Sequence, residues 1–153
     1  HKLEVIDGAI EKHKPNPNDP IDVLAKVGGL DICAMAGVFL GAAEHKIPVV
    51  IDGFISVVAA LSAARICPAA KDYFIASHAS FEPGYLLAVN ELGLEAPLLL
   101  KMRLGEGSGC PVMFRVLDAA YAIMNEMATF EEASINDSYL DEIRIGDNFT
   151  VKR

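Results

Sequence analysis

The chain has 153 residues, a formal net charge of −8 and 52% hydrophobic residues, which suits one globular domain and excludes a largely disordered protein. Its Lys and Arg residues are scattered, and the lack of a basic stripe argues against a nucleic-acid partner, although backbone amides can still bind a small anion. The three cysteines, Cys33, Cys67 and Cys110, form no CxxC pair, so we expect reduced thiols and a cytoplasmic protein. The opening residues carry no apolar signal segment, which favours the same compartment.

The first third of the chain predicts helices. An amphipathic pattern covers residues 3–13, and a loop rich in Pro and Asn follows up to residue 20. Asp19 and Pro20 form a good cap and first-turn pair for a helix that runs to Val27. Asp31 can cap a further helix over residues 32–43.

From residue 47 onward, strand and helix patterns alternate. Strands are predicted at residues 47–52, 72–78 and 97–104, and helices at residues 55–66 and 83–92. The first of these strands lies in an apolar run, 47–64, but Pro48, Asp52 and Gly53 interrupt it, so we expect no membrane span. The alternation predicts an α/β fold with a parallel sheet flanked by helices.

A glycine-rich loop and a long helix complete this pattern. Gly105, Gly107 and Gly109 alternate through the loop, and Pro111 opens the helix. We expect its buried side to hold the residues at helical spacing, which are Val112, Val116, Ala119, Ala120, Ile123, Met124 and Met127.

Polar residues cluster where the predicted strands end. Asp52 and Gly53 follow the first strand, residues 77–80 follow the second, and the glycine loop follows the third. Ligands of open α/β sheets bind beyond the carboxyl ends of the strands. The sequence therefore predicts a binding site that these three segments share.

The glycine loop leaves two interpretations open. It contains no GKS or GKT and has Cys110 where a dinucleotide fingerprint needs glycine or alanine, so it is either a phosphate-binding loop of another kind or a plain turn. Glu106, in its middle, either complements the positive end of the following helix or acts as a general base.

The remaining polar candidates have simpler interpretations. Ser77, His78 and Ser80 lie outside a GxSxG elbow and are too close in sequence for a triad; Ser80 suits a hydroxyl donor to phosphate, and His78 suits a structural role. No metal site is expected, because no HxxxH or HExxH spacing joins the four histidines, His1, His13, His45 and His78.

Several longer segments together resemble one enzyme family. They are IDVLAKVGGLD, AGVFLGAAEHKIPVVIDGFIS, SHASFEPG, LGLE, RLGEGSG and NEMATF, and they occur in family order between residues 22 and 132. This pattern resembles nicotinate-nucleotide–dimethylbenzimidazole phosphoribosyltransferases, which make the lower ligand of cobalamin. The resemblance implies a Rossmann-like α/β domain, with the C-terminal helices contributing to a small helical domain, and a homodimer.

The resemblance also implies a reaction and a site. Phosphoribose passes from nicotinate mononucleotide to 5,6-dimethylbenzimidazole, giving α-ribazole 5′-phosphate and nicotinate without a cofactor. Glu106 matches the family's catalytic base. The phosphate and nucleotide site falls on Ser80, Leu104, Gly105 and Gly107, and the substrate pocket extends to Asp31, Asp52 and Gly53.

The resemblance places this sequence within the C-terminal half of the family's chain. We expect an N-terminal helix and loop at 1–20, a core at 21–132 and a tail at 133–153, with little or no turnover from these residues alone. Two alternatives stay open: a non-catalytic nucleotide-phosphate binding module in which Glu106 only caps the helix, and a subunit of a relative that activates phenols.

Overall fold

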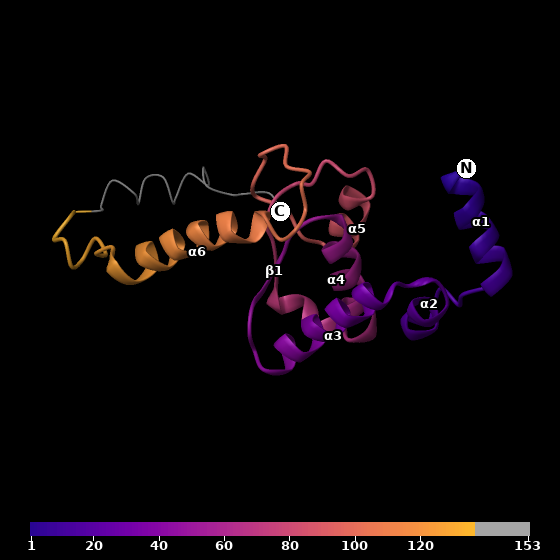
Figure 1. Cartoon of the computed structure of the whole chain (residues 1–153). Coiled ribbons are helices and arrows are strands. Elements are labelled where there is room, and N and C mark those ends of the chain that lie inside the picture. The colour runs from indigo at the N-terminus through magenta and orange to yellow at the C-terminus, as the bar shows by residue number, and fades with distance from the viewer. Residues whose placement is uncertain (137–153) are drawn as a thin grey trace, which may run out of the picture. The chain divides into compact units, whose positions relative to one another are not determined.

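The computed structural model describes residues 1–136, and the helices of its first third follow the predicted ones (Figure 1). They are α1 (Lys2–His13), α2 (Pro20–Val27) and α3 (Leu30–Glu44). The carboxylate of Asp19 accepts hydrogen bonds from the amides of Ile21 at 3.0 Å and Asp22 at 3.1 Å. The predicted cap of α2 is therefore confirmed, and it satisfies two of the amides that a helix start leaves free.

The start of α3 differs from the prediction. Gly29 is its N-cap residue, and no side chain accepts a capping hydrogen bond there. Asp31 instead lies within the first turn and is exposed to solvent. The expected cap role of Asp31 is wrong because α3 begins at Leu30, which places Asp31 inside the helix.

Two parallel strands form the sheet. β1 (Val49–Ile51) pairs with β2 (Phe74–Ala76), with Val49 opposite Phe74 and Ile51 opposite Ala76. The connection between them runs through α4 (Phe54–Ile66) and a 3₁₀ helix, η1 (Pro68–Tyr73). The predicted parallel βαβ unit is confirmed, and it brings the carboxyl ends of both strands to one edge.

The predicted third strand is reduced to one residue. Leu98 forms a parallel bridge beside His78: its amide donates to Ser77 O at 3.2 Å, and its carbonyl accepts from the Ala79 amide at 2.9 Å. Beyond it the backbone turns, with Lys101 at a φ of 53°. Because Leu and Met have little strand preference, nothing local keeps this run extended. The part of the chain that the structure describes is thus a mixed α/β fold with a two-stranded parallel sheet.

The core lies where α3, α4, β2 and α5 (Tyr85–Glu91) pack together. The buried face of α4 consists of small side chains that are fully removed from solvent: Val57, Ala59, Ala60 and Ala63. Phe39 of α3 meets Phe74 of β2 edge to face, with ring centroids 4.9 Å apart. This packing buries Ile51 of β1 and both Phe74 and Ala76 of β2 in the core.

The last described helix, α6, spans Gly109–Glu126. Residues 1–115 form one compact unit, and a second unit begins within this helix at residue 116. Only Gly109 and Met113 of α6 are buried, whereas the predicted buried side is exposed, with Met124 at 82%. The predicted burial of these α6 residues is wrong, because helical periodicity identifies an apolar side of a helix but not whether another element packs against that side.

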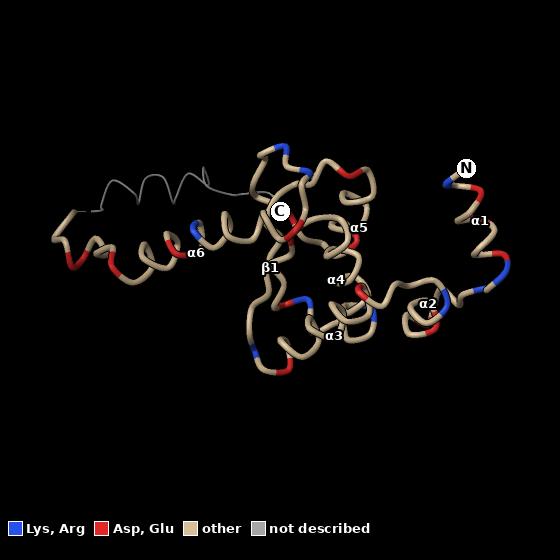
Figure 2. Tube along the Cα trace, in the orientation of Figure 1, with Lys and Arg blue, Asp and Glu red and all other residues tan. Residues whose placement is uncertain are grey.

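The structure bears on two expectations from the sequence, the scattered positive charges and the lack of a membrane span. Figure 2 shows Lys and Arg at scattered positions along the elements. Within residues 1–136, no helix is both long and apolar enough to cross a bilayer.

Candidate functional site

Three segments that are distant in sequence line one cavity of about 600 Å³. Asp52 and Gly53 follow β1, His78 and Ser80 follow β2, and residues 103–107 form the glycine loop. All of these segments belong to the compact unit of residues 1–115. The cavity therefore lies at the carboxyl ends of the parallel strands, where α/β folds bind ligands.

Part of the cavity lining is apolar. Met35, Val38 and Phe39 contribute from α3, and Phe54 and Ile55 contribute from the first turn of α4. A cavity with one polar edge and one apolar wall suits a ligand that is charged at one end and apolar at the other.

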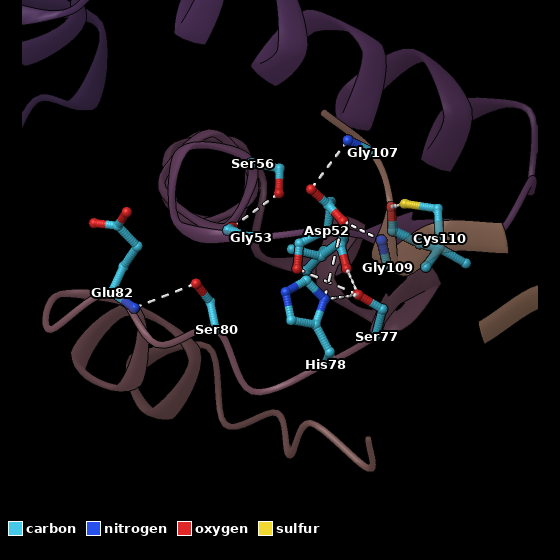
Figure 3. A network of polar contacts seen from close by, with 12 residues as sticks. Asp52, Gly53, Ser56, Ser77, His78, Ser80, Glu82, Gly107, Gly109 and Cys110 are labelled. Atoms are coloured by element: carbon cyan, nitrogen blue, oxygen red, sulfur yellow. Dashed lines mark hydrogen bonds and ion pairs between the residues drawn. The ribbon is translucent and has the colours of Figure 1, made fainter. Parts of the chain in front are cut away.

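Asp52 joins the first strand to the glycine loop (Figure 3). Its Oδ1 accepts a hydrogen bond from the Gly109 amide at 2.7 Å, and its Oδ2 accepts one from the Gly107 amide at 3.1 Å. The residue is only 8% exposed. Since Gly109 is the first residue of α6, the carboxylate satisfies a free amide at the positive end of that helix, which stabilises a buried negative charge.

His78 and Ser77 lie beneath this carboxylate (Figure 3). The single hydroxyl proton of Ser77 is directed at Ile51 O, 2.6 Å from its Oγ. Ser77 Oγ must therefore accept at its 3.1 Å contact with His78 Nδ1, which places a ring proton on Nδ1. That nitrogen lies 3.9 Å from Asp52 Oδ1, which is close to the carboxylate but beyond hydrogen-bond distance.

Gly109 fits this arrangement because it has no side chain. A Cβ built on Gly109 would overlap His78 Nδ1 and would lie 2.8 Å from Asp52 Oδ1, which is shorter than a real contact. The close approach of the backbone to two polar side chains thus requires glycine at this position.

The glycine loop takes a left-handed backbone conformation over three successive residues. The φ angles are 77° at Gly105, 59° at Glu106 and 74° at Gly107. Glu106 is exposed and lines the cavity, as does Leu104. Within residues 1–136, the amides of residues 104–106 donate no hydrogen bond, so they remain available to an anion.

Ser80 lies at the same polar edge and is 9% exposed. Its Oγ accepts a long hydrogen bond from the Glu82 amide, at 3.4 Å. The hydroxyl proton is not used in this contact, and it can be donated to a ligand in the cavity.

The sequence-predicted residues thus separate into two groups. One group lines the cavity and consists of Asp52, Gly53, Ser80, Leu104, Gly105, Glu106 and Gly107. The other group is Asp31 alone, which is exposed on α3 and does not line the cavity. In the described part of the chain, no group of three or more His, Cys, Asp or Glu could hold a metal ion.

Sequence reasoning missed the hydrogen bonds that hold the loop. Gly109 is the third of three alternating glycines, a pattern that indicates close approach of the backbone to another group but does not identify that group.

The sequence analysis also did not place Cys110 in the site, although Cys110 lines the cavity. Burial, together with the negative charge of Asp52, raises the pKa of the Cys110 thiol, which therefore stays protonated at neutral pH.

Comparison with known proteins gives consistent matches. A family model described as phosphoribosyltransferase matches residues 1–135. The nicotinate-nucleotide–dimethylbenzimidazole phosphoribosyltransferase of Clostridium perfringens is 58% identical over 143 residues, which are 94% of this chain and 40% of that protein. The enzyme of the same name from Ruminiclostridium cellulolyticum is 55% identical over 135 residues, 88% of this chain and 38% of that protein.

Solved structures agree with these relatives. A crystal structure of the Thermus thermophilus enzyme of this name superposes with a TM-score of 0.76 at 40% identity, covering 80% of this chain and 37% of that one. The chain thus spans about 40% of the length of the curated relatives that it matches.

Proposed function

We propose, from the premise that this chain belongs to the phosphoribosyltransferase family, that the full-length protein transfers phosphoribose from nicotinate mononucleotide to 5,6-dimethylbenzimidazole. The products are α-ribazole 5′-phosphate and nicotinate. The names of the relatives support this choice of donor and acceptor. The observation that carries the proposal is a carboxylate, a buried hydroxyl and unused backbone amides around one cavity.

The phosphate of the nucleotide binds at the polar edge of this cavity. The amides of Leu104 and Gly105 have no acceptor among the described residues, and the Ser80 hydroxyl has a proton to donate. Together they can surround a phosphate without any net positive charge on the protein. The Gly107 amide already donates to Asp52, so we assign Gly107 to the shape of the loop.

Glu106 acts as the general base. An attacking benzimidazole nitrogen makes a bond to the anomeric carbon of the ribose while the bond from that carbon to nicotinate breaks. The benzimidazole must lose its N–H proton as it attacks, and the positioned carboxylate of Glu106 can accept that proton. The same negative charge stabilises the oxocarbenium-like charge that develops on the sugar.

The apolar wall of α3 and α4 suits an aromatic ring, although the loop itself does not choose between a benzimidazole and a phenol. In the full-length protein we further propose a Rossmann-like domain with a small helical domain, a homodimer and a cytoplasmic location. The 153 residues form the C-terminal portion of that domain and have little turnover alone.

The test uses the full-length protein with nicotinate mononucleotide and measures release of nicotinate by chromatography. We expect release that depends on 5,6-dimethylbenzimidazole and does not occur when the acceptor is left out. Release with a phenol in place of the benzimidazole assigns the protein to the phenol-activating relatives. Binding of nicotinate mononucleotide without release under any acceptor would contradict an enzymatic role.

A further inference from the structure

Asp52 is the one cavity carboxylate in residues 1–136 that donors of the glycine loop hold on both oxygens. Of the other acids in the lining, Glu82 contributes its backbone amide to the bond with Ser80, and Glu106 extends from the loop itself. Both carboxylate oxygens of Asp52 are therefore engaged by the protein backbone, in contrast to a carboxylate that is free to contact a ligand.

The two donors of Asp52 come just after the residues proposed to take part in the chemistry. Gly107 directly follows Glu106, and Gly109 opens α6. Two backbone hydrogen bonds close successive turns here, from the Ser108 amide to Gly105 O and from the Cys110 amide to Gly107 O, both at 3.1 Å. Fixing the amides of Gly107 and Gly109 thus fixes the C-terminal end of the left-handed run that contains Glu106.

Besides its own turn hydrogen bonds, this run has a restraint from outside the loop, in Asp52. A non-glycine residue at positive φ is disfavoured, and Glu106 has a φ of 59°. Its side chain is exposed, so its own packing does not hold the backbone in place. Asp52, in contrast, is buried at the end of β1, where the sheet and the core fix its position.

We propose that Asp52 is a positioning residue: its carboxylate holds the Gly107 and Gly109 amides so that the loop presents Glu106 to the cavity and leaves the amides of residues 104–106 free. His78 lies beside the carboxylate, with its Nδ1 3.9 Å from Asp52 Oδ1. The catalytic consequence rests on the proposed function, whereas the restraint on the loop does not.

The first experiment measures amide hydrogen exchange in the full-length protein at single-residue resolution. In the unaltered protein we expect the amides of Gly107 and Gly109 to be protected and those of Gly105 and Glu106 to exchange freely. In Asp52→Asn, exchange at Gly107 or at Gly109 should rise about tenfold or more, since the side-chain amide keeps one acceptor oxygen and replaces the other with an NH₂ group. The matched control Glu82→Gln removes another cavity carboxylate and should leave these rates unchanged.

Equal exchange at all four amides in the unaltered protein would overturn the restraint, and so would unchanged rates in a folded Asp52→Asn variant. If that variant fails to fold, the comparison within the unaltered protein still decides. None of these readouts requires activity, so they remain informative if the proposed reaction is wrong.

The second experiment is a double-mutant cycle on kcat. If Asp52 acts through Glu106, Asp52→Asn lowers kcat in the unaltered protein but has little further effect in the Glu106→Gln background. A purely structural contribution of Asp52 would lower kcat by the same factor in both backgrounds, and that result would refute its positioning role.

Discussion

At the scale of single residues, the site depends on close approach between backbone and buried polar groups. Gly109 brings its amide to Asp52 because no side chain separates it from His78. Tyr85 is fully buried, and no hydrogen-bond partner for its hydroxyl is found in the described part of the chain. These two positions give direct tests of packing and of burial.

Gly109→Ala should destabilise the protein by about 1–3 kcal/mol, since the new methyl group overlaps His78 and Asp52 and forces them to move. Urea unfolding of the two proteins measures the difference. The matched control is Gly37→Ala, within α3, where a Cβ meets nothing within 4 Å. It should raise the unfolding free energy by about 0.5–1 kcal/mol through helix propensity. A neutral Gly109→Ala change would show that the close approach is not real.

Tyr85→Phe should change the response of stability to alkaline pH. Burial, and secondarily the charge of Asp52, raises the pKa of Tyr85 from 10.0 to about 12. The unfolded chain then loses this proton at lower pH than the folded one, so the stabilisation is complete below pH 10 and is lost as pH rises toward 12.

The unfolding free energy of the unaltered protein should therefore fall over that range by about 2 kcal/mol more than that of Tyr85→Phe. At neutral pH the two proteins should be similar, because the hydroxyl removed has no partner among the described residues. Tyr121→Phe alters a tyrosine that is 70% exposed and should not change the alkaline response. Parallel pH profiles for Tyr85→Phe and the unaltered protein would contradict the burial of this hydroxyl.

At the scale of elements, local signals succeeded where a side chain and its partner are close in sequence. Asp19 and Pro20 lie next to each other, and together they identified the start of α2. The third strand could not be predicted correctly, because its pairing is reduced to one bridge, Leu98 with His78, and Lys101 beyond it has a φ of 53°. The hydrogen bonds of Asp52 could not be predicted either, since their partners are separated from it by 55 and 57 positions in the sequence.

Asp19→Ala should cost about 1 kcal/mol of stability, because the amides of Ile21 and Asp22 lose their acceptor. Thermal or urea unfolding provides the measurement. Asp31→Ala is the matched control: this aspartate also lies at a helix start but accepts no capping hydrogen bond, and its loss should cost about 0.3 kcal/mol through the helix dipole alone. Equal costs at the two sites would mean that charge, and not capping geometry, stabilises these helix starts.

At the scale of the whole molecule, we propose a phosphate site in a chain of net charge −8. In this proposal, backbone amides bind the anion and a side chain provides the carboxylate. The amides of residues 104–106 and the Ser80 hydroxyl are donors that an anion can use, and Glu106 of the same loop lines the cavity. The predicted strand ends and the loop do line one cavity, as the alternating pattern of the sequence led us to expect.

The most direct measurement compares Glu106→Gln with the unaltered full-length protein, following both the dissociation constant for nicotinate mononucleotide and kcat for release of nicotinate. The account predicts an almost unchanged dissociation constant and a kcat lower by a factor of about 10²–10⁴, because only the proton acceptor is lost. Ser80→Ala should show the opposite pattern, with weaker nucleotide binding and a smaller effect on kcat. Near-normal kcat in Glu106→Gln would contradict the account and leave the loop as a binding element only.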